Sequence, residues 1–457
     1  MGQKPSVAKG TRDFFPAIVA KRQYIFQTIK DSFETYGFSP IETPSFELSS
    51  TLMGKYGEEG DRLIFRILNS GEKMKKADVD ALNEGNLPRF ANSLSEKALR
   101  YDLTVPFARF VVQHQNDLAF PFKRYQIQPV WRADKPQKSR YQEFYQCDAD
   151  VVGSDSLVYE VDYVQLFDEV LTNLNVPQAV IKINNRKILS GIAEVSGEAE
   201  KIVAITVAID KLDKIGLEGV LKELQSKGIS EDALEKIKPL FKITGDTRQR
   251  LVQMKTFLAD SEIGLKGIEE LEYIFNTTDQ LGLKSTEVEF DVTLARGLNY
   301  YTGAIFEVKC NAVSIGSICG GGRYDDLTGI FGMKNMSGVG ISFGADRIYD
   351  VLEELDLFPS SVDNRLELLF INFGEEEAAY CMGMVKKMRE AGVSSELYPK
   401  SAKMNKQMKY ANDRGVKFVA LVGKNEMEQG VLRIKNMDTG EQDDIQPDAL
   451  VNHLKKA

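Results

Sequence analysis

A run of basic residues between two strand-like segments is the first feature of this sequence that could do chemistry. The segment from Arg132 to Asp150 reads RADKPQKSRYQEFYQCDAD. Its ends have the pattern of two antiparallel strands joined by a basic loop. Such a hairpin would bring four cationic side chains together at its loop end, namely Arg132, Lys135, Lys138 and Arg140. Guanidinium groups can hold phosphate oxygens bidentately. Charge runs are usually only solvated surface, which is the simpler interpretation of one segment taken alone.

The strand expected after this loop presents a mixed face. Phe144, Gln146, Asp148 and Asp150 alternate along it, and alternate residues of a strand point to the same side of a sheet. A plain core strand does not need hydrogen-bond acceptors beside an aromatic ring. The pattern therefore favours a ligand site over a solvated hairpin.

Three later segments carry residues with similar potential, and each alone is weak evidence. LARGLNYYTG contains Arg296 and the pair Tyr300-Tyr301, although adjacent tyrosines are usually core residues with one hydrated hydroxyl. CGGGRYDDL places three glycines before an arginine and Tyr324, which permits close backbone approach to a ligand or simply a tight turn. GVGISFGADRI places Arg347 where a helix begins after a strand, and this arginine could pair with an acid or reach a phosphate.

Several reaction classes are excluded by what the sequence lacks. It has two histidines and no G-x-S-x-G motif, so histidine-assisted acyl hydrolysis is not expected. It has no P-loop, and its glycines near position 340 miss the dinucleotide fingerprint by one residue, so an ATP site must be of another kind. The net charge of −9 argues against indiscriminate coating of nucleic acid, so RNA contacts must be local and no DNA partner is expected.

The cysteines and the apolar runs indicate a cellular location. The four cysteines are scattered without C-x-x-C pairing, and no signal-peptide stretch opens the chain. No apolar run is long enough to cross a bilayer. We therefore expect a cytoplasmic protein without a membrane partner.

The chemical segments need a sheet to position them. The four-residue spacing of Ile25, Ile29 and Phe33 predicts a helix over 18–36, ended by Gly37. Short alternating or apolar runs between turns predict one mixed, mainly antiparallel sheet, with strands at 63–67, 125–130, 142–152, 286–292, 305–309 and 338–343. The polar segment 70–94 is expected to be a long mobile loop.

The residue composition and pattern of the chain change twice. Residues 184–283 become rich in Lys and Glu with helical apolar spacing, which indicates a helical insertion. After about residue 364, strand patterns at 366–373 and 418–422 alternate with helical ones at 378–391 and 405–413, which predicts a separate small α/β domain. At 457 residues, two or three units are expected, and the overall class is α+β.

Taken together and in this order, these segments resemble the three signature motifs of class II aminoacyl-tRNA synthetases. The unit ending in Ile41-Glu42-Thr43-Pro44 is similar to the dimer-forming first motif, the Arg132 hairpin to the second and the Arg347 segment to the third. The segments RGLNYY from Arg296 and GGRYD from Gly321 resemble those peculiar to histidyl-tRNA synthetases. The resemblance covers nearly the whole chain.

The resemblance implies the fold and its division. It implies a class II catalytic domain, with a mainly antiparallel sheet flanked by helices, in residues 1–183 and 285–358. It places the helical insertion at 184–284 and an α/β anticodon-binding domain at 366–457. It also implies a homodimer.

Roles at the ATP end follow from the same resemblance. It assigns the α-phosphate to Arg132, the outer phosphates to Arg140 and Arg347, and the adenine to Phe144. Arg296 matches the arginine that approaches both the α-phosphate and the substrate carboxylate. Arg132, Arg296 and Arg347 are therefore the catalytic residues that the resemblance implies, with ATP and Mg²⁺ as the nucleotide substrate and its ion.

Roles at the histidine and RNA ends are implied in the same way. The residues implied to bind histidine are Asp102, Thr104 and Gln146 at the ammonium group, Asp150, Tyr301 and Tyr324 around the imidazole, and Tyr300 and Arg296 beside them. Gln137 matches a position near the tRNA acceptor end, with Lys135 beside it. In the C-terminal domain, Lys403 and Lys406 belong to a basic cluster implied to contact histidine tRNA, although such clusters are usually only solvated.

The sequence departs from the common bacterial form, and two other functions compete with the synthetase. Where the common bacterial enzymes have a Pro-Glu pair, a Glu and an Asp, this sequence has Tyr101-Asp102, Asp150 and Asn299. The first two replacements are those of eukaryotic-type enzymes, whereas the loop after Arg132 is short, as in the bacterial ones. One rival function is a histidine-binding regulatory paralogue of ATP phosphoribosyltransferase, and another is a synthetase for a different amino acid. The complete arginine set and the extra C-terminal domain favour histidine-tRNA ligase.

Overall fold

The computed structural model describes residues 4–137, 139–295, 300–363 and 366–456. It divides the chain into two compact units, Met1–Phe358 and Pro359–Ala457, which are treated separately below. Among the described residues, no helix is long and apolar enough to cross a membrane.

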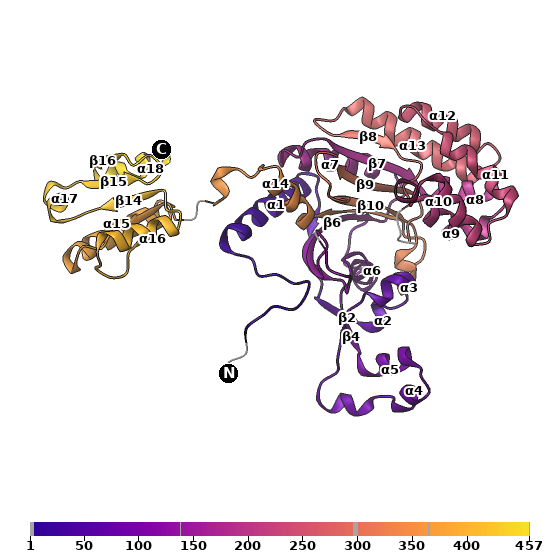
Figure 1. Ribbon diagram of the computed structural model, residues 1–457, viewed down its shortest axis with the longest axis horizontal. Coiled ribbons are helices and arrows are strands. Elements are labelled where there is room, and N and C mark those ends of the chain that lie inside the picture. Colours follow the sequence, from indigo (N-terminus) through magenta and orange to yellow (C-terminus); the bar gives the residue numbers. More distant parts are fainter. Residues whose placement is uncertain (1–3, 138, 296–299, 364–365, 457) are drawn as a thin grey trace. The chain divides into compact units, whose positions relative to one another are not determined.

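An eight-stranded sheet forms the centre of the first unit (Figure 1). In spatial order its strands are β1 (Ser39–Pro40), β5 (Phe122–Trp131), β6 (Glu143–Val152), β11 (Gly338–Gly344), β10 (Cys319–Tyr324), β9 (Ala304–Cys310), β7 (Ala179–Asn185) and β8 (Glu287–Phe290). The two outermost pairs, β1 with β5 and β7 with β8, are parallel, and the other neighbours are antiparallel. The predicted α+β fold with a mainly antiparallel sheet is confirmed, but the strand predicted for it at 63–67 is wrong, because that segment contributes only Arg66–Ile67 to a separate three-stranded sheet.

Helices cover this sheet because their apolar stripes match its apolar face. In α1 (Pro16–Thr35), Ile25, Ile29 and Phe33 are each at most 1% exposed, and the helix ends before Gly37, whose φ of +77° favours glycine. The helices α7 (Val158–Asn173) and α14 (Ala345–Glu354) pack against α1. The predicted helix at 18–36 is confirmed.

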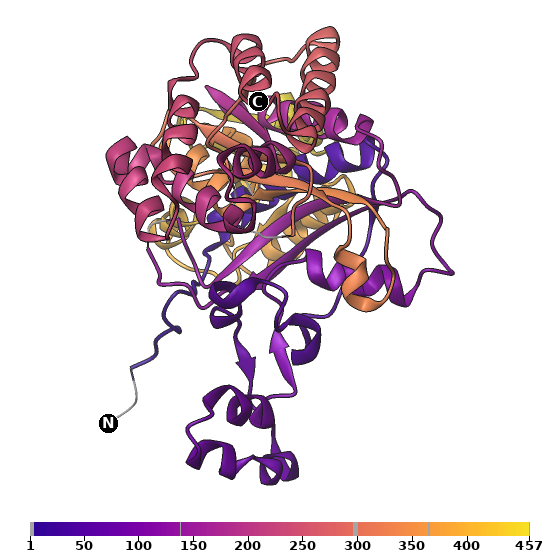
Figure 2. The same ribbon diagram turned by 90° about the vertical axis from the view of Figure 1, so that its right-hand side faces the viewer.

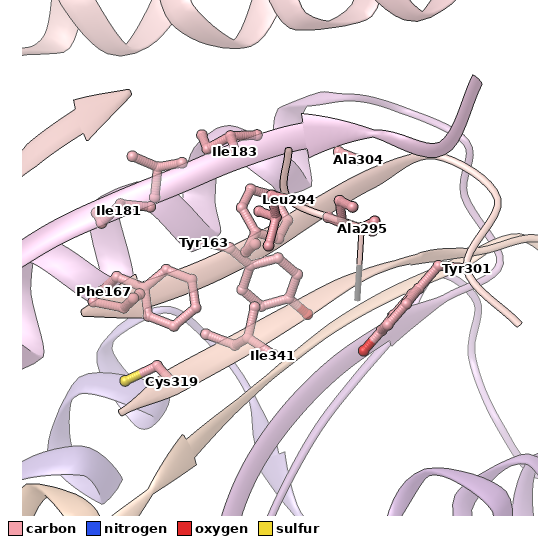
Figure 3. Packing of buried hydrophobic residues seen from close by; sticks show 14 of the residues in the cluster. Tyr163, Phe167, Ile181, Ile183, Leu294, Ala295, Tyr301, Ala304, Cys319 and Ile341 are labelled. Carbon is pink, nitrogen blue, oxygen red and sulfur yellow. The ribbon is translucent and has the colours of Figure 1, made fainter. Parts of the chain in front are cut away.

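The core between α7 and the sheet is seen in Figure 3. Tyr163 and Phe167 from α7 lie against Ile181 of β7 and Ile341 of β11, and all four are buried. The Tyr163 hydroxyl donates to the backbone oxygen of Val339 at 3.0 Å, so this polar group has a partner inside the core. Each such buried side chain contributes about 1.5–3 kcal/mol of transfer free energy.

Helices fill the chain between β7 and β8. They are α8 (Arg186–Ser196), α9 (Ile202–Ile209), α10 (Leu212–Ser226), α11 (Glu231–Ile237), α12 (Thr247–Phe257) and α13 (Glu262–Leu281). Figure 1 shows them gathered beyond the β7–β8 side of the sheet. The domain limits proposed at 184 and 284 stay a prediction.

The expectation of a long mobile loop at 70–94 is wrong. This segment holds a 3-10 helix (Gly71–Lys76), α4 (Val79–Asn83) and α5 (Leu87–Leu94), and Figure 2 shows it projecting beyond a small sheet formed by β2 (Phe46–Leu48), β4 (Lys97–Leu99) and β3 (Arg66–Ile67). Asp78 accepts a hydrogen bond from the Ala81 amide at 3.0 Å, and Asn86 accepts one from the Arg89 amide at 3.2 Å. Side-chain caps of this kind stabilise the first turns of short helices.

The second unit has its own sheet, in the order β13 (Ser395–Leu397), β12 (Leu368–Phe370), β14 (Phe418–Leu421), β15 (Leu432–Asn436) and β16 (Gln442–Ile445). The first three strands are parallel, and the last two continue antiparallel. The helices α15 (Glu375–Glu390) and α16 (Met404–Asp413) alternate with the parallel strands. The predicted alternation of strands and helices is confirmed, with β15 and β16 in addition.

Candidate active site

A cavity opens over the middle of the large sheet, where β6, β10 and β11 lie side by side. The β5–β6 hairpin pairs Phe122 with Val152 and Trp131 with Glu143, which confirms the two predicted antiparallel strands. Its loop is closed by two backbone hydrogen bonds between Gln137 and Arg140, of 3.2 and 3.0 Å. The loop's Lys138 lies outside the described residues.

Asp150 forms the charged floor of the cavity. It is 2% exposed, and its carboxylate accepts a hydrogen bond from the Tyr324 hydroxyl at 2.7 Å and faces a guanidinium nitrogen of Arg124 at 2.7 Å. Burial raises the pKa of Asp150, whereas Arg124 and the Tyr324 hydrogen bond lower it. Arg124 stands directly opposite Asp150 in the strand pairing and is fully buried, so this cation holds the carboxylate in place.

A second buried carboxylate, Asp102, lies just before α6 (Thr104–Gln113). Its Oδ1 accepts hydrogen bonds from the Tyr56 hydroxyl at 2.8 Å and from the Val105 amide at 3.1 Å. Burial raises the pKa of Asp102, and these two donors lower it. Negative charge at the start of a helix is also favoured by the helix dipole.

Glycines make room for these side chains. A Cβ at Gly340 would lie 1.9 Å from Oδ1 of Asp150, and a Cβ at Gly322 would lie 2.7 Å from the Tyr301 ring. The three consecutive glycines at 320–322 lie in strand β10, so the alternative of a tight turn is wrong, and a Cβ at Gly321 or Gly322 would lie within 3 Å of the neighbouring strands.

Three tyrosine rings enclose the same end of the cavity. The ring centroids of Tyr300 and Tyr301 lie 4.8 Å apart, and the Tyr300 and Tyr324 rings meet edge to face at 6.3 Å. Tyr301 and Tyr324 are 8% and 2% exposed. Burial raises the pKa of both Tyr300 and Tyr324 well above the usual value, so their hydroxyls stay protonated and can donate.

Arginines gather at the other end. The Arg132 guanidinium donates to the Tyr101 backbone oxygen at 3.1 Å and lies 5.2 Å from the centroid of the Phe144 ring. Arg347, in the first turn of α14, donates to the Ser317 backbone oxygen at 2.6 Å. Arg140 is 3.4 Å from Asp134 with half of its side chain exposed. The cavity is therefore lined by buried carboxylates and by more exposed arginines, as a site for a cation joined to phosphates requires.

Comparison with known proteins identifies this arrangement. The family model described as histidyl-tRNA synthetase matches residues 89–348, and the model described as anticodon binding domain matches residues 367–457. The chain belongs to the histidyl-tRNA synthetase family. It is 61% identical over 456 residues, covering both chains fully, to a protein from Christiangramia forsetii named histidine–tRNA ligase. It is also 61% identical over 455 residues, again with full coverage of both chains, to the protein of that name from Phocaeicola vulgatus.

A solved histidyl-tRNA synthetase has the same fold. The crystal structure of that enzyme from Nostoc sp. PCC 7120 matches with a TM-score of 0.83 at 30% identity and covers 100% of each chain. The likeness therefore extends over both units of the chain.

Most of the site residues predicted from the sequence line this one cavity of the histidyl-tRNA synthetase fold. They are Asp102, Thr104, Arg132, Arg140, Phe144, Gln146, Asp150, Tyr300, Tyr301, Tyr324 and Arg347. Arg296 lies outside the described residues. Lys135 and Gln137 are exposed and do not line the cavity, and Lys403 and Lys406 are exposed on or beside α16 in the second unit.

Arg124 and Tyr56 hold the cavity carboxylates Asp150 and Asp102, and both are absent from the set predicted from the sequence. Arg124 carries little sequence signal, because it is the third residue of β5 and Lys123, Gln126 and Gln128 make the same strand polar. Tyr56 gives no sequence signal, because it is 46 residues from the Asp102 that it contacts.

Proposed function

We propose that this chain is a histidine-tRNA ligase that joins histidine to the α-phosphate of ATP, releases pyrophosphate and then esterifies histidine onto the 3′-terminal ribose of histidine tRNA. The observation that supports this most strongly is the single cavity with a buried carboxylate-tyrosine floor and an arginine rim. That cavity lies in a chain 61% identical, from end to end, to proteins named histidine–tRNA ligase.

The acidic floor suits the histidine side chain. Asp150 and the hydroxyl of Tyr301 or Tyr324 can serve the two ring nitrogens, with Tyr300 packed beside them. An apolar amino acid would leave these buried groups unpaired, which is worth roughly 10⁴ or more in discrimination. Histidine selection is thus built from hydrogen bonds and not from pocket size alone.

The ammonium group of the substrate fits between α6 and β6. Asp102 offers a carboxylate and Thr104 a hydroxyl at the start of α6. Gln146 donates to the Ser342 hydroxyl at 3.2 Å, and its buried Oε1 accepts from none of the described residues. That oxygen can accept from the ammonium group.

The arginine rim suits the phosphates. The substrate carboxylate is ionised at neutral pH, so its attack on phosphorus needs no general base. The step needs alignment and neutralisation of charge instead. Arg132 and Arg296 would hold the α-phosphate, Arg140 and Arg347 the outer phosphates, and Phe144 the adenine.

Transfer to tRNA needs one proton acceptor. A phosphate oxygen of the adenylate can take the proton of the ribose hydroxyl as the ester forms and AMP leaves. No side chain then has to act as the base.

The metal ion of the reaction would bind together with the nucleotide. No three His, Cys, Asp or Glu side chains are grouped to hold a metal ion in the part of the chain that the structure describes. Mg²⁺ commonly binds through substrate phosphates with few protein ligands, so it would accompany ATP and add positive charge at the phosphates.

The remaining partners extend this proposal. Lys403 and Lys406 would meet phosphates of histidine tRNA in the anticodon-binding domain, and Lys135 and Gln137 would lie near its acceptor end. The protein would act as a homodimer in the cytoplasm.

Attachment of labelled histidine to histidine tRNA in the presence of ATP tests the whole proposal. Product that requires all three substrates, and that no other amino acid replaces, supports it. Histidine binding without any product, even at high enzyme concentration, would point to a regulatory histidine-binding protein instead.

A further inference from the structure

A third buried carboxylate in the cavity has no role in the function proposed above. Asp148 lies on β6 between Gln146 and Asp150, on the same face of the strand, and is 2% exposed. It lines the cavity together with Asp102 and Asp150. A further buried aspartate of the cavity lining, Asp346, is paired with Arg12 and Arg22, so Asp102, Asp148 and Asp150 are the buried carboxylates without such a pair of arginines.

Among the described residues, the groups around Asp148 do not neutralise its charge. Arg124 of β5 is engaged with the Asp150 carboxylate at 2.7 Å and reaches only the backbone oxygen of Asp148, at 3.4 Å. The strand β11 brings the Ser342 hydroxyl, and β6 itself brings the Gln146 amide, 3.5 Å from Asp148 Oδ1. The charged groups that act on Asp148 from the packed elements are thus Arg124, Asp150 and Asp102.

Arg124, the cation that acts on Asp148, is shared with the Asp150 carboxylate. Burial raises the pKa of Asp148 to about 7, with Asp150 and Asp102 adding to the increase and Arg124 opposing it. Near neutral pH about half of the free protein therefore carries a proton on this carboxyl. A cationic ligand placed in the cavity would favour the ionised form.

We propose that Asp148 is a further histidine-binding residue, which faces the positively charged part of the substrate and releases its proton to solvent when histidine binds. This rests on the proposed function, because the argument needs histidine in this cavity. The positive group is the ammonium, since Gln146, next along the same face, offers its buried Oε1 there. The release makes histidine binding a proton-linked reaction.

Isothermal titration of the full-length protein with histidine, without ATP, measures this proton directly. Titrations in buffers of different ionisation enthalpy at pH 7 give the number of protons released, and the same measurement on Asp148→Asn gives the background from histidine itself. We expect the wild type to release about half a proton more than the variant. We also expect the variant to bind histidine about tenfold or more weakly, as for loss of a charged hydrogen-bond partner.

The wild type alone provides a second measurement that does not depend on folding of the variant. At pH 8 most of the Asp148 carboxyl is already ionised, so the release should fall to about a tenth of a proton. An unchanged proton count between pH 7 and pH 8 would overturn the proposal. So would equal proton counts and equal affinities for the wild type and a folded Asp148→Asn variant.

A matched control separates this inference from the function on which it rests. Asp162 of α7 is a partly buried carboxylate with a raised pKa that pairs with Lys123 at 3.7 Å and does not line the cavity. Asp162→Asn should keep the wild-type affinity and proton count. A wild-type protein that bound no histidine would refute the proposed function, whereas histidine binding without the extra proton would refute only the role of Asp148.

Discussion

The structure gives its most detailed prediction of lost activity and lost stability for the substitution Asp150→Asn. The carboxylate of Asp150 has two partners, the Tyr324 hydroxyl and the Arg124 guanidinium, each at 2.7 Å. An amide of the same shape can accept from one of them, but its NH₂ group then faces the other donor. The variant therefore lacks a charged acceptor for the substrate ring and leaves a buried guanidinium without its counterion.

Two magnitudes follow from this geometry. A hydrogen bond to a charged group is worth about 1.5–3 kcal/mol, so kcat/KM for histidine should fall roughly 10- to 150-fold. Breaking a buried ion pair by removing one partner costs about 3–5 kcal/mol, so the free energy of unfolding should fall by an amount of that order. Asp150→Ala, which removes both oxygens, should abolish activation of histidine.

Exchange of pyrophosphate into ATP, measured as a function of histidine concentration, is the assay for Asp150→Asn. The KM for ATP should stay near the wild-type value, because the partners of Asp150 are Arg124 and Tyr324 and not the arginines proposed to bind the phosphates. Urea unfolding monitors stability in parallel, and Asp162→Asn serves as a control outside the cavity. Near-normal kcat/KM for histidine in a folded Asp150→Asn variant would remove Asp150 from the site and refute this reasoning.

Three further substitutions test other parts of the account. Gly340→Ala should raise the KM for histidine by about tenfold or more in the exchange assay, since its Cβ would lie 1.9 Å from Oδ1 of Asp150 and must displace it. Asp148→Asn without histidine should be more stable than the wild type at pH 8 by up to about 4 kcal/mol, because a pKa raised from 3.8 to about 7 destabilises the folded protein as pH rises through that window. Urea unfolding should show this difference shrinking towards zero near pH 4. Replacing Lys403 and Lys406 together by alanine should lower histidine attachment to tRNA and leave pyrophosphate exchange unchanged. The slope of tRNA affinity against salt concentration should fall by about one for each phosphate that the variant no longer binds.

Matched variants show what would contradict these three outcomes. Gly383→Ala adds a Cβ that meets no atom within 4 Å and should be silent, so equal effects from Gly340→Ala and Gly383→Ala would remove the steric explanation. A stability difference for Asp148→Asn that is constant from pH 4 to pH 8 would contradict the raised pKa. Lys409 is already paired with Asp413 at 2.6 Å, and a defect in Lys409→Ala as large as that of the double variant would exclude a specific phosphate interaction of Lys403 and Lys406.

Local patterns explain what could be predicted from the sequence. The helix carrying Ile25, Ile29 and Phe33, and the hairpin between Arg132 and Asp150, follow from periodicities of 3.6 and 2 within one segment. The alternation of acceptors along β6 is enough to predict one face of the cavity. These elements form because their own residues favour them.

Long-range interactions explain what could not be predicted. The strand β10 is rich in glycine, which lowers strand propensity, and it becomes a strand because β9 and β11 pair with it on both sides. In segment 70–94 the many polar residues and the glycines favour a loop, although Leu87, Phe90 and Leu94 recur at helical spacing, and side-chain caps from Asp78 and Asn86 start two of its helices. The charge balance among Asp148, Asp150 and Arg124 depends on strand pairing and burial, which no single segment reveals.

Histidine-dependent exchange of pyrophosphate into ATP by the purified protein tests the central claim most directly, with an Arg296→Ala variant measured alongside. The account predicts exchange that requires histidine, is not supported by other amino acids and collapses in the variant. Measurable histidine binding with no exchange in the wild type would contradict the account and assign the chain a regulatory role instead.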